Sequence, residues 1–216
     1  MNAPRILLLD WNGTLQDDVL AAVAGTNAIL ADQGSPRIDV DRYRAVFSFP
    51  ARGCYEALGI EVDEATWPAL CDRFFAVFSS HPSVRLVPGA AEALRLLRAA
   101  GVSMCVVSAS DETELRRALA RHGVADLFDS VCGQRGPFAG SKVERALALF
   151  AELGVSPSDA LVVGDTGHDA EVAAAIGCGC VLVETGYESR ARLLRHGVPV
   201  IGSVADLPAF LGVVAP

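Results

Sequence analysis

The sequence predicts an α/β protein built on a parallel sheet, with an all-helical domain inserted early in the chain. Three observations support this class. Short apolar runs recur along the chain, and segments with apolar residues at helical spacing separate them. The stretch 16–85, in contrast, carries helical patterns and no convincing strand. Alternation of strands and helices is typical of parallel sheets, so the insertion interrupts an otherwise regular pattern.

The strand candidates share short, mostly β-branched apolar runs, and continuous runs of this kind indicate strands buried on both faces. Between them, residues such as Ala90, Leu94 and Leu97 repeat at helical spacing. The helices are bounded by Gly or Pro, which end regular structure. The predicted strands are 5–10, 102–108, 160–164, 180–183 and a weaker 199–201.

The insertion contains four helical patterns separated by QGSPRI, FSFP and GIEVD. These patterns cover 19–32, 41–46, 51–58 and 64–79. A four-helix cap at 16–85 is the simplest interpretation, with a core formed by 1–15 and 86–216. Two connections between cap and core permit hinge motion.

Composition excludes several classes of function. The chain has 18 Lys and Arg against 26 Asp and Glu, a formal charge of -8, which argues against a nucleic-acid surface. A local cation or a helix N-terminus still permits phosphate binding. In the opening MNAPRILLLDWNGT, the apolar run before Asp10 is far too short for a signal peptide or a membrane span. We therefore expect a cytoplasmic protein without membrane contact, monomeric or homodimeric, whose six Cys are reduced thiols.

Chemically active side chains follow the predicted strands. Asp10 ends the first strand, Ser108 ends the second, and Asp165 and Asp169 follow the strand ALVVG. Lys142 opens a helix after the loop GQRGPFAGS. A parallel sheet gathers such residues at its carboxyl edge, where open α/β sheets bind ligands.

Three carboxylates, a lysine and a hydroxyl in one crevice suit phosphoryl transfer. Two or more acids can hold a divalent cation while one acid attacks phosphorus. The lysine and the hydroxyl then bind phosphate oxygens. Because every plausible ligand is oxygen, Mg²⁺ is favoured over softer metals.

Four segments, in order, resemble the motifs of the haloacid dehalogenase-like superfamily. The resemblance covers nearly the whole chain and is closest to the phosphoglycolate-phosphatase-like branch. It implies a Rossmann-like parallel-sheet core, an inserted helical cap and a small phosphorylated metabolite as substrate. The motif residues are Asp10-Trp11-Asn12-Gly13-Thr14-Leu15, Ser108, Lys142 and Gly164-Asp165-Thr166-Gly167-His168-Asp169.

The resemblance also implies residue roles. Asp10 attacks phosphorus and becomes an aspartyl phosphate, while Thr14, Ser108 and Lys142 hold phosphoryl oxygens. Asp10, Asp165 and the backbone carbonyl of Asn12 ligate Mg²⁺. Asp169 ligates the metal, orients its waters or orients Lys142.

Asn12 departs from the family pattern, which places a second Asp there as general acid and base. An amide does not shuttle protons at accessible pH, so a factor of roughly 10²–10⁴ in rate is at stake. The outcomes left open are a slow phosphatase for good leaving groups, a phosphatase that recruits another acid, and a protein that binds phosphoesters without turnover. His168 is a candidate replacement acid because imidazole titrates near neutrality, although it could instead cap or pack its helix.

Substrate choice is expected in the cap, where Arg52 could meet a carboxylate or a second phosphate. Asp18 is interpreted as a helix cap or a solvated acid rather than a ligand. Two enzyme alternatives are weaker: a dehalogenase needs no metal acid such as Asp165, and a phosphonatase needs a cap lysine, whereas Lys142 is the chain's only Lys. A non-catalytic binding or scaffold protein is the alternative outside the enzymes.

Overall fold

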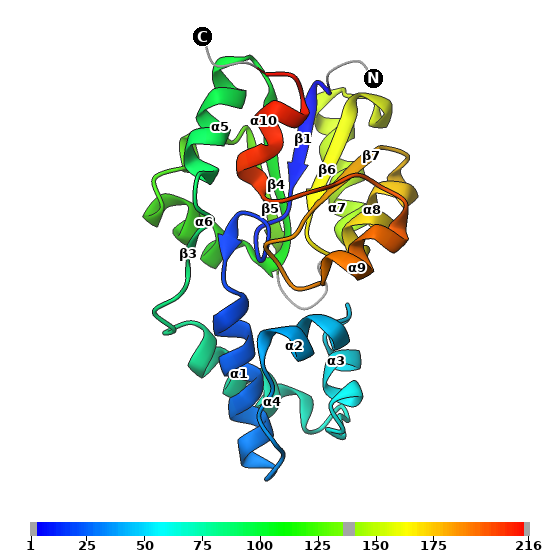
Figure 1. Cartoon of the computed structure of the whole chain (residues 1–216). Helices are drawn as coiled ribbons and strands as arrows, with labels where there is room; N and C mark the ends of the chain where they lie inside the picture. The colour runs from blue at the N-terminus through cyan, green and yellow to red at the C-terminus, as the bar shows by residue number, and fades with distance from the viewer. Residues whose placement is uncertain (1–3, 136–140, 214–216) are drawn as a thin grey trace.

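The computed structural model describes residues 4–135 and 141–213 and confirms the predicted α/β class. Figure 1 shows a sheet flanked by helices, with a separate group of helices beneath the carboxyl ends of the strands. None of the helices in these two ranges combines the length and apolarity needed to cross a membrane.

The main sheet contains six strands in the order β5-β4-β1-β6-β7-β8, and every neighbouring pair is parallel. The chain moves outward from β1 to β4 and β5, then crosses to β6 on the other side of β1. This reversal is a topological switch point, where α/β sheets bind ligands. The strands are β1 (Ile6–Leu9), β4 (Ser103–Asp111), β5 (Ser130–Gln134), β6 (Ala160–Gly164), β7 (Gly179–Val183) and β8 (Val200–Ile201).

Helices cover both faces of this sheet, which explains why its central strand is apolar throughout. In β1, Leu7 and Leu9 pack with one hydrophobic cluster, while Ile6 and Leu8 pack with the other. All four are buried, as expected of a strand covered on both sides. The helices are α5 (Ala90–Ala99), α6 (Glu112–Arg121) and α10 (Leu207–Phe210) on one face, and α7 (Lys142–Leu153), α8 (Gly167–Ile176) and α9 (Arg190–Leu193) on the other.

The helical insertion consists of four helices and two very short strands that form its stem. Because β2 pairs antiparallel with β3, the prediction that 16–85 is wholly helical was wrong at both ends. The stem carries an ion pair between Asp17 and Arg85, which lie opposite each other. The elements are β2 (Gln16–Asp17), α1 (Val19–Asp32), α2 (Val40–Val46), α3 (Arg52–Ala57), α4 (Trp67–Phe78) and β3 (Arg85–Leu86).

Two features of the main sheet escaped sequence analysis. Strand β5 was missed because it is short, lies at the sheet edge and contains Gly133 and Cys132 in place of β-branched residues. Strand β4 continues past Ser108 to Asp111, with a register irregularity after Val107. The loop expected before Lys142 lies partly outside the described residues, at 136–140.

Glu112 joins β4 to β5 through a network of hydrogen bonds at the start of α6. Its carboxylate accepts from Arg135 at 2.7 Å, from Arg116 at 2.9 Å and from the backbone N–H of Gly133 at 3.3 Å. The bonds from Arg135 lower the pKa of Glu112 to about 2, even though burial opposes them. The stabilisation is therefore present above pH 4.5, the ordinary value, and fades as the pH falls towards 2.

We expect Glu112→Gln to lower the free energy of unfolding by about 1–2 kcal/mol at pH 7, because two arginines lose an anionic partner. Glu114→Gln is the matched control, since Glu114 is an exposed acid on the same helix that also pairs with an arginine. It should cost less than about 0.5 kcal/mol. Urea unfolding at pH 7 and pH 3 measures both. A Glu112→Gln deficit that did not shrink at pH 3 would contradict the assigned charge.

Candidate active site

Three acids meet at the carboxyl edge of the sheet, beside the switch point. Asp10 follows β1, Asp165 follows β6, and Asp169 lies in the first turn of α8. One carboxylate oxygen from each lies within 4.8 Å of the others. Asp165 and Asp169 are 1% exposed, and Asp10 retains some exposure towards a cavity. The structure thus brings together the acids predicted from the sequence.

Lys142 lies among these acids because it is the first residue of α7. Ser141 precedes it and forms a capping box with Glu144, which fixes where the helix begins. The ammonium Nζ lies 2.6 Å from Asp169 Oδ1 and 3.1 Å from Asp10 Oδ1. Burial alone would lower the pKa of Lys142, but the two carboxylates outweigh it and raise the pKa above its ordinary value. Lys142 is therefore a fixed positive charge beside Asp10.

The three acids are not equally stabilised as anions. Burial raises the pKa of Asp10 to about 6, partly offset by attraction to Lys142. The pKa of Asp165 is raised well above its ordinary value, first by burial and then by repulsion from Asp169 and Asp10. Burial also acts on Asp169, yet Lys142 and Thr166 hold its pKa below the ordinary value. The surroundings thus disfavour the charged forms of Asp10 and Asp165 and favour that of Asp169.

Asp169 is held by its own helix start. Its Oδ2 accepts from the Thr166 hydroxyl at 2.9 Å and from the backbone N–H groups of Asp165 and Thr166 at 3.2 Å. Its Oδ1 accepts from Lys142. Of the roles considered for Asp169, the contact made in this structure is the one that orients Lys142.

The donor set fits a hard divalent cation. Asp10 and Asp165 offer carboxylate oxygens next to each other, and the cluster sets three carboxylates against one ammonium. Asp165 receives hydrogen bonds from the Thr14 hydroxyl and the backbone N–H of Tyr187, and both donors are uncharged. A dication would favour the charged form of Asp165, against the burial and the repulsion that raise its pKa.

Thr14 lies elsewhere than the resemblance implied. Its hydroxyl donates to Asp165 Oδ1 at 2.9 Å, and the residue is 0% exposed, so it faces an acid and not the cavity. The turn WNGT folds tightly, with backbone N–H groups of residues 14–16 donating to the Trp11 carbonyl, which turns the hydroxyl inward. In this structure Thr14 positions Asp165.

Gly13 lets this turn approach Asp165. Its φ is 72°, in the left-handed region, and a Cβ built on it would lie 2.3 Å from Asp165 Oδ2. A side chain at position 13 would therefore strain the backbone and also displace the carboxylate.

We expect Gly13→Ala to weaken Mg²⁺ binding by about tenfold or more, because the carboxylate of Asp165 must move. Gly34→Ala is the matched control: Gly34 has a φ of 67°, but a Cβ there would meet nothing within 4 Å. Both variants should lose about 1 kcal/mol of stability to backbone strain. Isothermal titration with Mg²⁺ separates them, and equal affinities would contradict the placement of Asp165 at the cation site.

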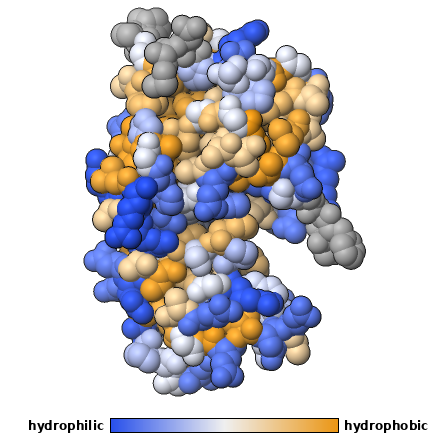
Figure 2. Space-filling view, turned by 90° about the vertical axis from the view of Figure 1, so that its right-hand side faces the viewer, coloured by the Kyte–Doolittle hydropathy of each residue, from blue (hydrophilic) through white to orange (hydrophobic). Residues whose placement is uncertain are grey.

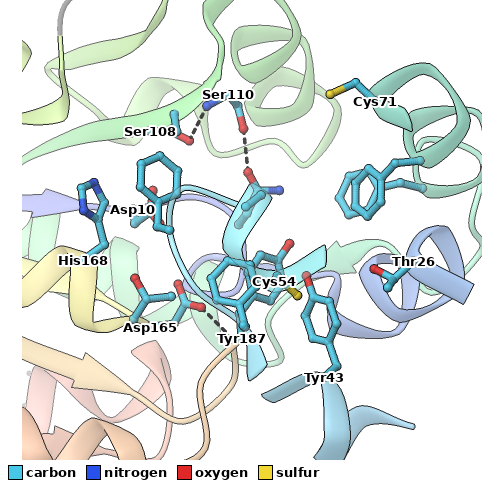
Figure 3. Close-up of a pocket in the computed structure, with 18 of the residues that line it drawn as sticks. Asp10, Thr26, Tyr43, Cys54, Cys71, Ser108, Ser110, Asp165, His168 and Tyr187 are labelled. Atoms are coloured by element: carbon cyan, nitrogen blue, oxygen red, sulfur yellow. Dashed lines mark hydrogen bonds between the residues drawn. The ribbon is translucent and has the colours of Figure 1, made fainter. Parts of the chain in front are cut away.

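Asn12 is fixed by hydrogen bonds on both ends of its amide. Its Oδ1 accepts from the Ser110 hydroxyl at 2.6 Å, and its Nδ2 donates to Asp18 Oδ2 at 2.6 Å. Figure 3 draws this bond as a dashed line from Ser110. Because one end of the side chain must donate and the other accept, the surroundings suit an amide.

Asp18 is neither a helix cap nor a solvated acid. It occupies the N-cap position of α1 without capping it, and it is 0% exposed. Its carboxylate accepts from Asn12, from the Gly13 backbone and from Gln16, and the Tyr187 hydroxyl also bonds to it. Burial nevertheless raises the pKa of Asp18 to about 6. The role of Asp18 as a buried hydrogen-bond acceptor for Asn12 was not predicted from the sequence, and neither were the contacts of Ser110 and Tyr187.

Ser108 and His168 both line the cavity. The Ser108 hydroxyl accepts from the backbone N–H of Ser110 at 3.1 Å. His168, near the start of α8, stacks on Phe49 with ring centroids 4.2 Å apart. Figure 3 places His168 close to Asp10 and Asp165. The imidazole therefore packs against the helical insertion and lines the same cavity as the acids.

A cavity of about 310 Å³ lies between the acids and the helical insertion. In Figure 2 the outline of the molecule narrows between these two parts. Figure 3 sets Asp10 and Asp165 on one side, with Thr26 and Cys71 on the other. Nine Phe, Tyr and Trp residues line the cavity, which is most of the 2 Trp, 3 Tyr and 9 Phe in the chain. They are Tyr43, Phe47, Phe49, Tyr55, Trp67, Phe74, Phe75, Phe78 and Tyr187.

Arg52 is not among the residues that line this cavity, although its neighbours Ala51, Cys54 and Tyr55 are. Its guanidinium lies over the ring of Trp67, 5.5 Å from the centroid, a cation–π arrangement. The substrate contact of Arg52 stays a prediction.

Comparisons with known proteins agree with this site. The family described as "Haloacid dehalogenase-like hydrolase" matches residues 7–183. A phosphoglycolate phosphatase from Caulobacter vibrioides is 30% identical over 210 residues, covering 94% of this chain and 88% of its own length. The range matched by the family, residues 7–183, includes the positions of all four motifs.

Solved structures extend the likeness to the whole fold. A predicted phosphatase from Clostridium acetobutylicum superimposes with a TM-score of 0.82 at 19% identity, covering 99% of this chain and 100% of that one. Protein tyrosine kinase A from Mycobacterium tuberculosis gives a TM-score of 0.78 at 27% identity, with the same coverage of both chains. The helical insertion is thus part of a shared fold.

Proposed function

This chain belongs to the haloacid dehalogenase-like hydrolase family, and on that premise we propose that it is a Mg²⁺-dependent phosphohydrolase acting on a small phosphomonoester. The observation that carries the proposal is the convergence of Asp10, Asp165 and Lys142 at the switch point of the sheet. Relatives named phosphoglycolate phosphatase support a small phosphorylated substrate. Residues 16–85 would act as the cap over the site.

The reaction would proceed in two displacements at phosphorus. A carboxylate oxygen of Asp10 forms a bond to phosphorus, and the bond from phosphorus to the leaving oxygen breaks with its electron pair on that oxygen. Water then attacks the same phosphorus, and the bond to Asp10 breaks. This step releases inorganic phosphate and restores the carboxylate, while the water proton passes to solvent or to a nearby base.

Each remaining residue has a role that its position supports. Lys142 lies 3.1 Å from Asp10 and offers N–H donors to phosphoryl oxygens. The Ser108 hydroxyl in the cavity wall offers an O–H donor. Asp10, Asp165 and the backbone carbonyl of Asn12 would hold the cation. When bound, Mg²⁺ neutralises charge between the acids and the phosphoryl group. Asp169 and Thr14 keep Lys142 and Asp165 in place.

Asn12 supports a second candidate, a weakly active or inactive phosphoester-binding protein. Its amide is hydrogen bonded at both ends, to Ser110 and Asp18, and supplies no proton to a leaving group. His168 lines the same cavity, and the protonated form of its imidazole can donate a proton. Single-turnover hydrolysis by His168→Asn tests this, because an unchanged rate would remove the residue from consideration.

The test of the proposal is hydrolysis of a panel of phosphomonoesters by the purified protein, with Mg²⁺ and after chelation. We expect Mg²⁺-dependent release of phosphate from at least one ester. Binding of vanadate or of the esters without release of phosphate would favour the second candidate. Release that survived chelation unchanged would contradict the proposed role of the cation.

A further inference from the structure

We infer that the preferred substrate is an aryl phosphomonoester, whose aromatic ring packs against the helical insertion while its phosphoryl group meets Asp10 and Lys142. This inference rests on the proposed function and deepens it. Three features of the cavity support it: the aromatic wall, the positions of the Lys and Arg side chains, and the amide of Asn12.

The wall facing the acids is built from rings. Phe49 stacks on His168 across the boundary between insertion and sheet, which brings a ring next to the phosphoryl position. Phe49 and Phe75 both line the cavity although they are 47% and 55% exposed overall, so two large apolar side chains face a space open to ligands. Exposed rings of this kind favour an aromatic or apolar partner, which removes them from water.

The same wall is poorly suited to a carboxylated leaving group such as glycolate. Among the described residues, Lys142 is the only lysine or arginine that lines the cavity, and it already pairs with Asp10 and Asp169. Arg52 lies on the Trp67 ring, and Arg44 donates to the carbonyls of Gly186 and Thr185. A carboxylate buried against the rings would lack a cation, which is costly.

Asn12 points to the same class through the chemistry of the leaving oxygen. When the bond from phosphorus breaks, the electron pair stays on that oxygen, and an alkoxide needs a proton at that moment. A phenol ionises near a pKa of ~10, as tyrosine does, so a phenoxide departs as an anion and takes its proton later from water. An aryl ester therefore tolerates the amide at position 12 better than an alkyl ester does.

Three esters separate these arguments in one experiment. Benzyl phosphate and phosphoglycolate both release an alkoxide through a CH₂–O–P linkage, and they differ in carrying a phenyl ring or a carboxylate. We expect kcat/KM for benzyl phosphate to be at least about tenfold higher, because the ring finds an apolar wall. Phenyl phosphate shares the ring but releases a phenoxide, so its kcat should exceed that of benzyl phosphate by about 10²-fold or more.

Variants of the wall supply the second arm. Phe49→Leu and Phe75→Leu should each lower kcat/KM for both ring-bearing esters by about fivefold, and by clearly more than for phosphoglycolate. Both side chains are partly exposed, so these changes leave the fold intact. Phe210→Leu is the matched control, because Phe210 is 37% exposed on α10 and does not line the cavity.

The outcomes separate the inference from the function on which it rests. If none of the three esters is hydrolysed with Mg²⁺ but another ester of the panel is, the proposed function stands and the aryl preference is wrong. If no ester of the panel is hydrolysed, both fail. If phosphoglycolate is hydrolysed as efficiently as benzyl phosphate, or if Phe49→Leu lowers both alike, the enzyme stands and the aryl preference is wrong.

Discussion

Replacing Asp10 with Asn should abolish turnover, lowering kcat by on the order of 10⁴-fold or more, because an amide does not attack phosphorus. The change keeps the shape of the side chain and removes one charge from a cluster of three acids. Lys142 retains its 2.6 Å bond to Asp169, so it stays in place. Phosphate release under saturating substrate and Mg²⁺ measures the loss.

Two controls make this result specific. The thermal unfolding midpoint should not fall, because removing one of several mutually repelling carboxylates relieves repulsion. Asp111→Asn, at the end of β4, changes an acid that caps α6 outside the cavity lining and should keep parental turnover. Parental turnover by a folded Asp10→Asn variant would exclude Asp10 as the nucleophile.

Exchanging the amide at position 12 with the acid at position 18 should raise turnover of alkyl phosphates by on the order of 10²-fold, because it supplies a general acid beside the leaving group. The double variant Asn12→Asp/Asp18→Asn reverses the donor and acceptor across the present 2.6 Å hydrogen bond. For aryl phosphates the first displacement, measured in a single turnover, should gain much less, since phenoxides depart without protonation.

The single variant Asn12→Asp is the informative comparison. It places two carboxylates against each other in a buried site, so we expect a smaller gain in rate and a loss of about 1–3 kcal/mol in stability. Urea unfolding and rates on benzyl and phenyl phosphate measure both effects. If the folded double variant hydrolysed benzyl phosphate no faster than the parent, the missing acid would not limit this enzyme.

Much of the fold was predictable because its signals are local. The predicted helix 19–32 and the predicted strand 160–164 coincide with α1 and β6, since the first carries a helical pattern and the second is a short continuous apolar run. Strand β5 was missed because its residues, SVCGQ, carry little strand preference of their own. Its position is set by pairing with β4, and sequence patterns do not report such tertiary pairing.

The site was predictable where residues follow strands, and not where side chains turn away from the expected direction. Asp10 and Asp165 meet because parallel strands end at one edge, a consequence of topology. Thr14 turns inward to Asp165, and Asp18 turns towards Asn12, because the tight WNGT turn and burial decide their partners. Tyr187 reaches the site from the loop after β7. The sequence signal that could have identified it is that this loop follows a predicted strand, as the loops of Asp10 and Asp165 do.

Asp10 is expected to accept the phosphoryl group, so acid quenching during turnover should trap an aspartyl phosphate on this residue. Because Asn12 does not activate water, the second displacement should be slow enough for the aspartyl phosphate to accumulate. Peptide mapping of the quenched protein, using the fastest ester found, should place one phosphoryl group on Asp10 and none in the Asp10→Asn variant. Release of phosphate while Asp10 stays unmodified, or a phosphoryl group on another residue, would contradict the assignment of Asp10 as the nucleophile.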